Sequence, residues 1–287
     1  MKVLTSREAR KIIAQLNRMD LDRANYEYIQ ELIGKLIVGI PMRGITPHKE
    51  SRIYRGIVYK EKPSTTDQLG YPPAEIVANF QRCNPPAKPM FYCSPDPASV
   101  FCELDVTVGD SVYLSKWSII NNFFINQIAP ITEDGIDHPV KDIVFTFFET
   151  NFSKPIHETY SSQYKITSAI ADKLSFGNID GNWGKIGAIT YPSVSHPGRS
   201  ENLAIRPEIV DSCLKLDYIE ELHVTAVEGT KISYNRTDFS ASFDGKNIKW
   251  EGKILHWTVP PGGSVVATAE RDGWVLRDEQ GNIVNPG

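Results

Sequence analysis

The segment 80–103 carries side chains that suit a ligand with phosphates and a ring. Arg82 lies in a loop stiffened by the proline pair at 85–86. A stiff loop holds a guanidinium in the fixed direction that bidentate phosphate recognition needs. Tyr92 follows in a short predicted strand and offers a flat aromatic face and one hydroxyl. Glu103 adds a carboxylate at the end of a predicted helix, so the segment is a candidate binding site with one acidic group.

Four motifs follow one another along the chain, and this segment supplies the middle two. They are Ile53-Tyr54-Arg55-Gly56, Arg82-Cys83-Asn84-Pro85-Pro86, Phe91-Tyr92 through Ala98 to Glu103, and Tyr191-Pro192-Ser193 followed by Asn202-Leu203. Each motif is weak alone, but the four in this order are more specific. Over roughly residues 51–210 the chain resembles the RES domain family, named for its Arg, Glu and Ser residues. Cys83 stands where the family commonly has an aromatic residue, and an insertion at 104–160 separates the Glu helix from the later strands.

RES proteins resemble ADP-ribosyltransferases in fold and act on NAD. Characterised members are often toxins of toxin–antitoxin pairs, which cleave NAD by hydrolysis or phosphorolysis or transfer its ADP-ribose to a protein. The resemblance implies a catalytic group made of Glu103, Arg55 and Ser193. It implies an NAD-binding group made of Arg55, Arg82, Asn84, Tyr92 and Ser193, with Tyr92 near the nicotinamide.

The chemistry of NAD cleavage agrees with these roles. Breaking the nicotinamide–ribose bond builds positive charge on the sugar, as glycoside cleavage does. Glu103 would stabilise that charge, while Arg55 and Arg82 would neutralise the pyrophosphate. Ser193 is expected to hydrogen-bond the nicotinamide amide or a ribose oxygen. It is not expected to be a nucleophile, because no base is evident beside it and His196 reads as a solvated loop residue.

Three functions stay open at this point. The first is an NAD glycohydrolase or phosphorylase, which could act as a toxin, and NAD is then a substrate. The second is an ADP-ribosyltransferase that modifies a protein, and the third is a non-catalytic NAD-binding protein. The expected partners are NAD and either an antitoxin or a protein acceptor. A Rossmann dinucleotide site is excluded, because no GxGxxG motif follows a predicted strand.

Bulk properties narrow the class of protein. The 287 residues are 41% hydrophobic and 23% charged, as in a globular protein with a sizeable core. A net charge of −4 argues against a nucleic-acid partner. The four cysteines form no CxxC pair and have no nearby histidine, so no metal site is expected. The longest apolar stretches are too short to span a bilayer, so a cytoplasmic protein is expected.

The elements that must position these residues predict an α+β fold. The expected core is the bent, mostly antiparallel sheet of ADP-ribosyltransferases with flanking helices. The predicted regions are a helical pair in 1–45, an NAD-binding catalytic domain in 46–216, and a β-rich region in 217–287 that packs on the core. Helices are predicted at 5–19, 22–38, 97–103, 160–175 and 207–214, and strands at 52–59, 90–93, 188–193 and 202–205. A strand pair is predicted at 104–117 around Gly109, and the stretches 119–130 and 139–150 are expected to be partly helical.

Overall fold

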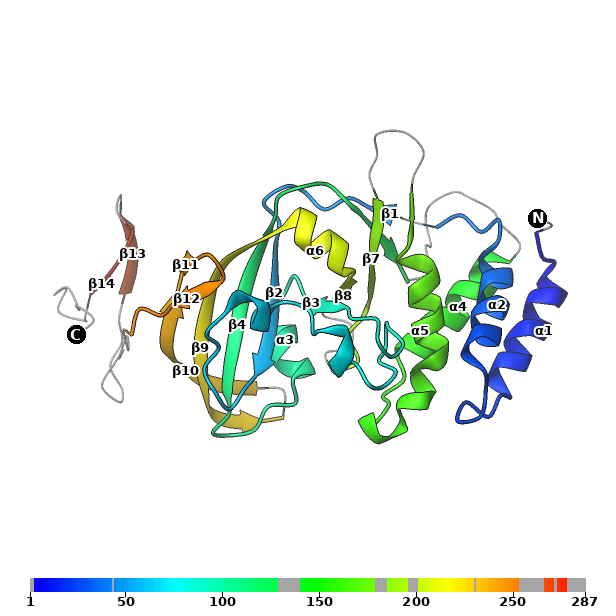
Figure 1. Ribbon diagram of the computed structural model, residues 1–287, viewed down its shortest axis with the longest axis horizontal. Coiled ribbons are helices and arrows are strands. Elements are labelled where there is room, and N and C mark those ends of the chain that lie inside the picture. Colours follow the sequence, from blue (N-terminus) through cyan, green and yellow to red (C-terminus); the bar gives the residue numbers. More distant parts are fainter. Residues whose placement is uncertain are drawn as a thin grey trace.

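The computed structural model of this protein is a mixed α+β structure (Figure 1). It describes residues 3–42, 44–128, 140–178, 185–195, 201–229, 231–252, 266–270 and 273–277. Its helices are α1 (Ser6–Asn17), α2 (Tyr26–Ile37), α3 (Pro97–Glu103), α4 (Lys141–Phe152), α5 (Lys165–Leu174) and α6 (Pro207–Cys213). Short 3-10 helices are η1 (Thr66–Leu69), η2 (Ala74–Ile76) and η3 (Glu158–Tyr164). None of the helices in these residues has the length and apolar character that crossing a membrane requires.

Two sheets of mostly antiparallel strands form the centre of the fold. The first sheet has the order β1 (Gly44–Ile45), β5 (Phe124–Gln127), β7 (Lys185–Pro192), β8 (Glu201–Ile205) and β3 (Phe91–Cys93), with β6 (Gly177–Asn178) also paired to β7. Only the β5–β7 pair within the described strands is parallel. The second sheet has the order β10 (Lys231–Ser240), β9 (Leu214–Glu228), β4 (Ser111–Ile119) and β2 (Arg52–Val58). Two hairpins follow, β11 (Ser242–Asp244) with β12 (Asn247–Lys249), and β13 (Val266–Glu270) with β14 (Gly273–Arg277).

The two sheets are joined at Tyr54 and Ser94. Tyr54 lies in β2 of the second sheet, and Ser94 directly follows β3 of the first. The backbone N–H of Tyr54 donates to the carbonyl of Ser94 at 2.8 Å, and Ser94 N–H donates back to Tyr54 at 2.9 Å. This antiparallel bridge brings Arg55 and Tyr92, which are far apart in sequence, to neighbouring positions.

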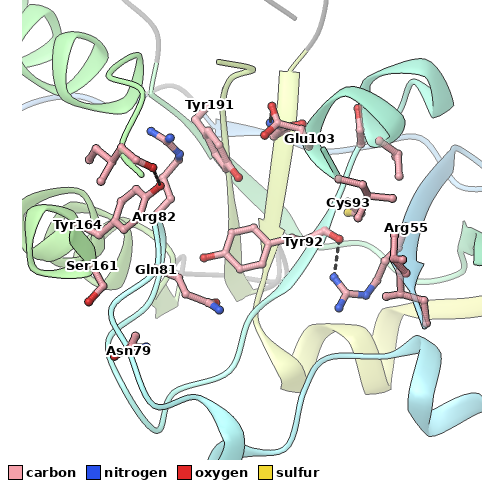
Figure 2. Close-up of a pocket in the computed structure, with 18 of the residues that line it drawn as sticks. Arg55, Asn79, Gln81, Arg82, Tyr92, Cys93, Glu103, Ser161, Tyr164 and Tyr191 are labelled. Atoms are coloured by element: carbon pink, nitrogen blue, oxygen red, sulfur yellow. Dashed lines mark hydrogen bonds between the residues drawn. The ribbon is translucent and has the colours of Figure 1, made fainter. Parts of the chain in front are cut away.

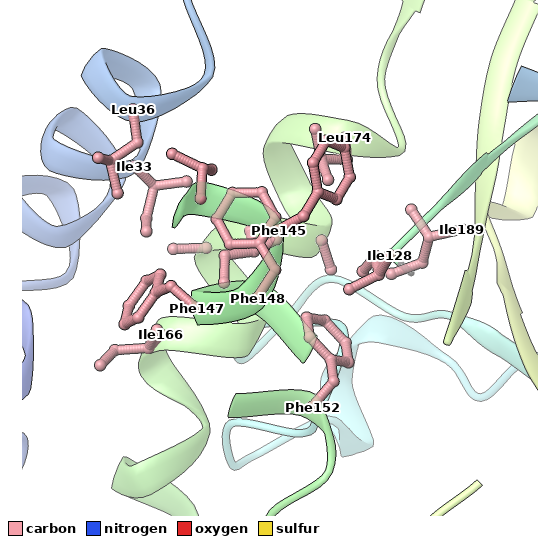
Figure 3. Packing of buried hydrophobic residues seen from close by; sticks show 14 of the residues in the cluster. Ile33, Leu36, Ile128, Phe145, Phe147, Phe148, Phe152, Ile166, Leu174 and Ile189 are labelled. Carbon is pink, nitrogen blue, oxygen red and sulfur yellow. The ribbon is translucent and has the colours of Figure 1, made fainter. Parts of the chain in front are cut away.

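Four helices lie on one side of the first sheet (Figure 1): α4 and α5 contact β7, and α1 and α2 pack on α4 and α5. Its centre is packed with apolar side chains from several helices and from β7 (Figure 3). Phe145, Phe147 and Phe148 of α4 are buried there, which confirms that they are core residues. The predicted N-terminal helical pair therefore contributes to the same core as α4 and α5.

Local signals account for most helix boundaries. Thr5 and Glu8 form a capping box at the start of α1, with Thr5 N–H donating to Glu8 Oε2 at 2.8 Å. The start predicted for the second helix was early, because Asn25 caps α2 by accepting a hydrogen bond from Tyr28 N–H at 2.8 Å. Asp96 caps α3, which spans the helix predicted at 97–103, and Pro97 occupies its first position.

The strand pair predicted at 104–117 was wrong. Only β4 is a strand there, and residues 104–110 form a turn between α3 and β4. Thr107 N–H donates to Asp110 Oδ2 at 2.7 Å, and Gly109 adopts a φ of +99°. Gly109 N–H then donates to the carbonyl of Val224, which lies in β9. The helical expectation for 119–130 was also wrong, because its described residues hold the end of β4 and the strand β5 but no helix. α4 is the helix expected within 139–150.

The first part of the predicted C-terminal β region belongs to the second sheet. β9 begins at Leu214 and pairs with β4 from Ile119–Leu214 to Ser111–His223. The boundary predicted between 216 and 217 therefore falls inside a strand that is central to this sheet. Residues 253–265 of the predicted β-rich region lie outside the described residues.

Two glycines offer a matched test of this packing. A Cβ at Gly187 in β7 would lie 2.0 Å from Ile209 Cγ1, whereas a Cβ at Gly34 in α2 would meet only Lys173 Cε at 3.9 Å. We expect Gly187→Ala to lower the free energy of unfolding by about 1–3 kcal/mol through overpacking. We expect Gly34→Ala to raise it by roughly 0.5–1 kcal/mol through helix propensity. Urea denaturation measures both, and an unchanged Gly187→Ala midpoint would contradict the close approach of α6 to β7.

Candidate functional site

A cavity of about 670 Å³ opens where the two sheets are joined. Its wall comes from β2, β3, α3, the loop 79–82, the segment 156–164, β7 and β8. The volume lies within the range of about 300–1,000 Å³ common for small-molecule sites. Among the predicted site residues, Arg55, Arg82, Tyr92 and Glu103 line this cavity (Figure 2).

Arg55 is a cation without a carboxylate partner in the described part of the chain. Its Nη1 donates to the backbone carbonyl of Tyr92 at 2.8 Å, and its guanidinium lies 5.2 Å from the ring centre of Phe91. Its Nε is inaccessible to solvent and makes no hydrogen bond with a described residue. Burial lowers the pKa of the Arg55 guanidinium from its ordinary value. An anion in the cavity would supply the charge and the acceptor that this side chain lacks.

Arg82 has a different environment, because its donors are used by the end of α4. Nη1 donates to the carbonyls of Phe152 at 2.6 Å and Lys154 at 3.2 Å, and Nη2 donates to Lys154 at 3.3 Å. The guanidinium also stacks 5.2 Å from the ring centre of Tyr164. The last carbonyls of a helix have no partner within the helix, and a cation there is stabilising. Arg82 thus lines the cavity while fixing α4 and the segment that follows it.

Glu103 is held by side chains from two strands of the first sheet. Its Oε1 accepts a hydrogen bond from Ser193 Oγ at 2.6 Å and another from Asn202 Nδ2 at 2.8 Å. Ser193 directly follows β7 and Asn202 lies in β8, and both are buried, whereas Glu103 is exposed to the cavity. Ser193 and Asn202 follow Glu103 by 90 and 99 positions in the sequence, yet both donate to the same oxygen of its carboxylate.

Close packing of α3 on β2 places Glu103 over the cavity. A Cβ at Gly56 would lie 2.5 Å from Val100 Cγ1 and 2.7 Å from Leu104 Cδ1, so only glycine leaves room for α3. Gly56 directly follows Arg55 in β2. The same strand thus carries the cation and accepts the helix that carries the carboxylate.

Asn84 and Tyr92 form a network beneath the cavity wall. Tyr92 Oη donates to Asn84 Oδ1 at 2.6 Å and accepts from Cys83 N–H at 3.0 Å. Asn84 is buried and does not line the cavity, so its position supports Tyr92 rather than a ligand. Burial raises the pKa of the Cys83 thiol to about 12, which fits an unreactive cysteine.

Several cavity residues were not predicted from the sequence. Asn202 stood in the fourth motif without an assigned role, so that motif was a usable signal. Tyr191 also stood in that motif without an assigned role, whereas Tyr164 lines the cavity through tertiary packing and no motif marks it. His196 lies outside the described residues. Among the residues that are described, no three His, Cys, Asp or Glu side chains gather as a metal site requires.

The charges of the cavity wall favour an anionic ligand. Its ionic side chains within the described residues are two arginines and one glutamate, and neither arginine pairs with a carboxylate. No protein-family model matches the chain, and no curated protein matches its sequence. This cavity and the sequence motifs are therefore the features that indicate a function.

Removing the Tyr92 hydroxyl tests the network beneath the wall. Tyr92→Phe leaves Asn84 Oδ1 and Cys83 N–H without this partner, so we expect the free energy of unfolding to fall by about 1–3 kcal/mol.

The same variant carries a pH signature. Burial raises the pKa of Tyr92 well above its ordinary value of 10.0. Below pH 10 the tyrosine is protonated in both states, and as pH rises above 10 only the unfolded chain loses the proton. The stability of the wild type should therefore fall as pH rises above about 10, and Tyr92→Phe should reduce that slope. Denaturation from pH 8 to 11 measures this, with Tyr160→Phe as a control because Tyr160 is 64% exposed. Equal slopes in all three proteins would contradict a buried, protonated Tyr92.

Proposed function

We propose that this protein is an NAD-consuming enzyme that cleaves the nicotinamide–ribose bond and passes the ADP-ribosyl group to water or phosphate. The observation that carries the proposal is a carboxylate, Glu103, held by two donors in the same cavity as an uncompensated guanidinium, Arg55. The RES-like motifs supply these residues in order. The toxin role, an antitoxin partner and a cytoplasmic location come from the resemblance and the composition, and the cavity does not bear on them.

The anionic part of NAD fits the Arg55 side of the cavity. The pyrophosphate carries two negative charges, and its oxygens are stronger acceptors than the single carbonyl that Arg55 now contacts. Arg55 Nη2 makes no hydrogen bond with a described residue, and unlike Nε it is not closed off from solvent. A phosphate oxygen would accept a hydrogen bond from Nη2 and offset the desolvation of the guanidinium.

Glu103 suits the charge that develops during cleavage. The bond between ribose C1′ and the nicotinamide nitrogen breaks, and its electron pair leaves with nicotinamide, which becomes neutral. The sugar gains oxocarbenium character that a fixed carboxylate stabilises. The oxygen of water then bonds to C1′ and its proton passes to solvent, which yields ADP-ribose.

Ser193 takes a more limited role in this proposal than the sequence suggested. Its hydroxyl donates to Glu103 Oε1 at 2.6 Å and it does not line the cavity. With Asn202 it orients the carboxylate, so that the second carboxylate oxygen is available to the ribose. Ser193 is therefore a positioning residue here, and Tyr92 contributes a ring to the wall.

We also propose that the core has an ADP-ribosyltransferase-like fold. An ADP-ribosyltransferase-like core is a bent, mostly antiparallel sheet arrangement with its site at the bend. Here two mostly antiparallel sheets join at Tyr54 and Ser94, and the cavity lies beside that junction. This arrangement supports the assignment.

Turnover of NAD is the direct measure of this activity. The purified protein should release nicotinamide from NAD, and Glu103→Gln should lower kcat by about 10²–10³-fold with little change in stability. Chromatographic detection of nicotinamide measures this, and Glu75→Gln, an exposed carboxylate in η2, is the matched control. If no nicotinamide is released with water, phosphate or candidate proteins as acceptor, the proposed reaction is contradicted.

A substitution of Arg55 separates the effect on NAD binding from the effect on folding. Arg55→Met removes a partly desolvated cation and keeps an unbranched side chain. We expect it to retain or raise the free energy of unfolding, because the desolvation penalty disappears. We expect NAD affinity to fall at least tenfold, since a charged hydrogen bond contributes about 1.5–3 kcal/mol. Urea denaturation and calorimetry measure the two effects, and unchanged affinity would remove Arg55 from the ligand site.

A further inference from the structure

The cavity has two sides with different chemistry. In Figure 2, Tyr92 and Glu103 lie between Arg55 on one side and Arg82, Tyr164 and Gln81 on the other. The Arg55 side continues along β2 to Val58 and Tyr59, and the other side is formed by the loop 79–82 and the segment 156–164. This second side is called the aromatic subsite below.

The aromatic subsite combines ring faces with uncharged polar groups. Phe80 and Tyr164 supply its rings, and Tyr191 of β7 adds a third ring to the cavity wall. Asn79, Gln81 and Ser161 also line it, and their side chains make no hydrogen bond with a described residue. Arg82 is present, but the carbonyls of Phe152 at the end of α4 and of Lys154 just after it accept from its Nη atoms. The subsite therefore suits a ring with an uncharged polar substituent better than a phosphate.

Covalent order then fixes the direction of a bound dinucleotide. This step rests on the proposed function, which places ribose C1′ at Glu103. The pyrophosphate is attached to that ribose through C5′ and belongs with Arg55. The nicotinamide is attached at C1′, so it lies away from the pyrophosphate, on the far side of Glu103. The geometry points to the aromatic subsite as the nicotinamide site, with Gln81 as the residue that recognises the carboxamide.

Gln81 has the chemistry that this recognition needs. A carboxamide offers two N–H donors and one carbonyl acceptor, and a glutamine side chain offers the complementary set. Tyrosine faces also attract the positively charged pyridinium of bound NAD. The adenosine lies beyond Arg55 near Tyr59, a cavity residue that is 41% exposed and offers a stacking surface.

Two NAD analogues and two variants test this orientation. In 3-acetylpyridine adenine dinucleotide a methyl ketone replaces the carboxamide, and in nicotinamide hypoxanthine dinucleotide a carbonyl replaces the adenine amino group. The variants are Gln81→Ala and Tyr59→Ala, both made in the Glu103→Gln background so that the ligand is not consumed. Both positions are exposed, so folding should be retained, and thermal denaturation checks this. Calorimetry gives the Kd of each ligand for each protein.

The expected result is a crossed pattern. Gln81→Ala should reduce the preference for NAD over the acetylpyridine analogue by about tenfold, the effect of one lost hydrogen bond. Its preference for NAD over the hypoxanthine analogue should not change. Tyr59→Ala should weaken the binding of NAD and the acetylpyridine analogue equally, which leaves their ratio unchanged.

Other outcomes separate failure of this inference from failure of the proposed function. If Gln81→Ala changes the hypoxanthine ratio, the dinucleotide lies in the opposite direction and the inference is overturned. If neither ratio changes, Gln81 does not recognise either ring and the inference is also overturned. If the crossed pattern appears but the wild type releases no nicotinamide, the subsite stands and the proposed reaction fails. If no dinucleotide binds, both are overturned.

Discussion

Arg55 keeps a positive charge in a partly dehydrated wall where no described carboxylate neutralises it. Moving an unpaired ion out of water costs several kcal/mol even after relaxation. One carbonyl and one aromatic ring offset only part of that cost. The rest of the fold must therefore hold the strand that carries Arg55, and β2 is fixed by β4 on one side and by the Tyr54–Ser94 bridge on the other.

β2 carries Arg55 and also packs against the helix that carries Glu103. Gly56 lets α3 approach β2 closely, and α3 brings Glu103 to the wall that holds Arg55. On the far side, Arg82 fixes the end of α4 and so positions the segment 156–164. The two arginines thus serve different ends, one as a charge available to a ligand and the other as a clamp on a helix.

Sequence reasoning succeeded where a short segment decides its own structure. Asp96 and Pro97 specify the start of α3, and the strand predicted at 52–59 is present as β2. It failed at 104–110, because the Thr107–Asp110 turn and the contact of Gly109 with β9 outweigh strand propensity. The motif order named Arg55, Arg82, Tyr92 and Glu103 as neighbours, and they share the cavity. It did not reveal that Arg82 donates to the carbonyls of Phe152 and Lys154. Nor did it reveal that Gln81 and Tyr164 join the cavity wall, since those contacts exist only after the chain has folded.

The Glu103 cluster also determines when a site can exist during synthesis. Its donors come from the end of β7 and from β8, and β8 is also the strand that pairs with β3. A nascent chain that has emerged only through α3 has Arg55 and Glu103 but neither donor, and β3 has no partner strand in the first sheet. Long-range pairing of this kind forms late, because closure of a long loop precedes the gain from contact. An incomplete chain therefore carries Arg55 and Glu103 without the frame that aligns them, and the cavity wall is complete only when β8 has joined the sheet.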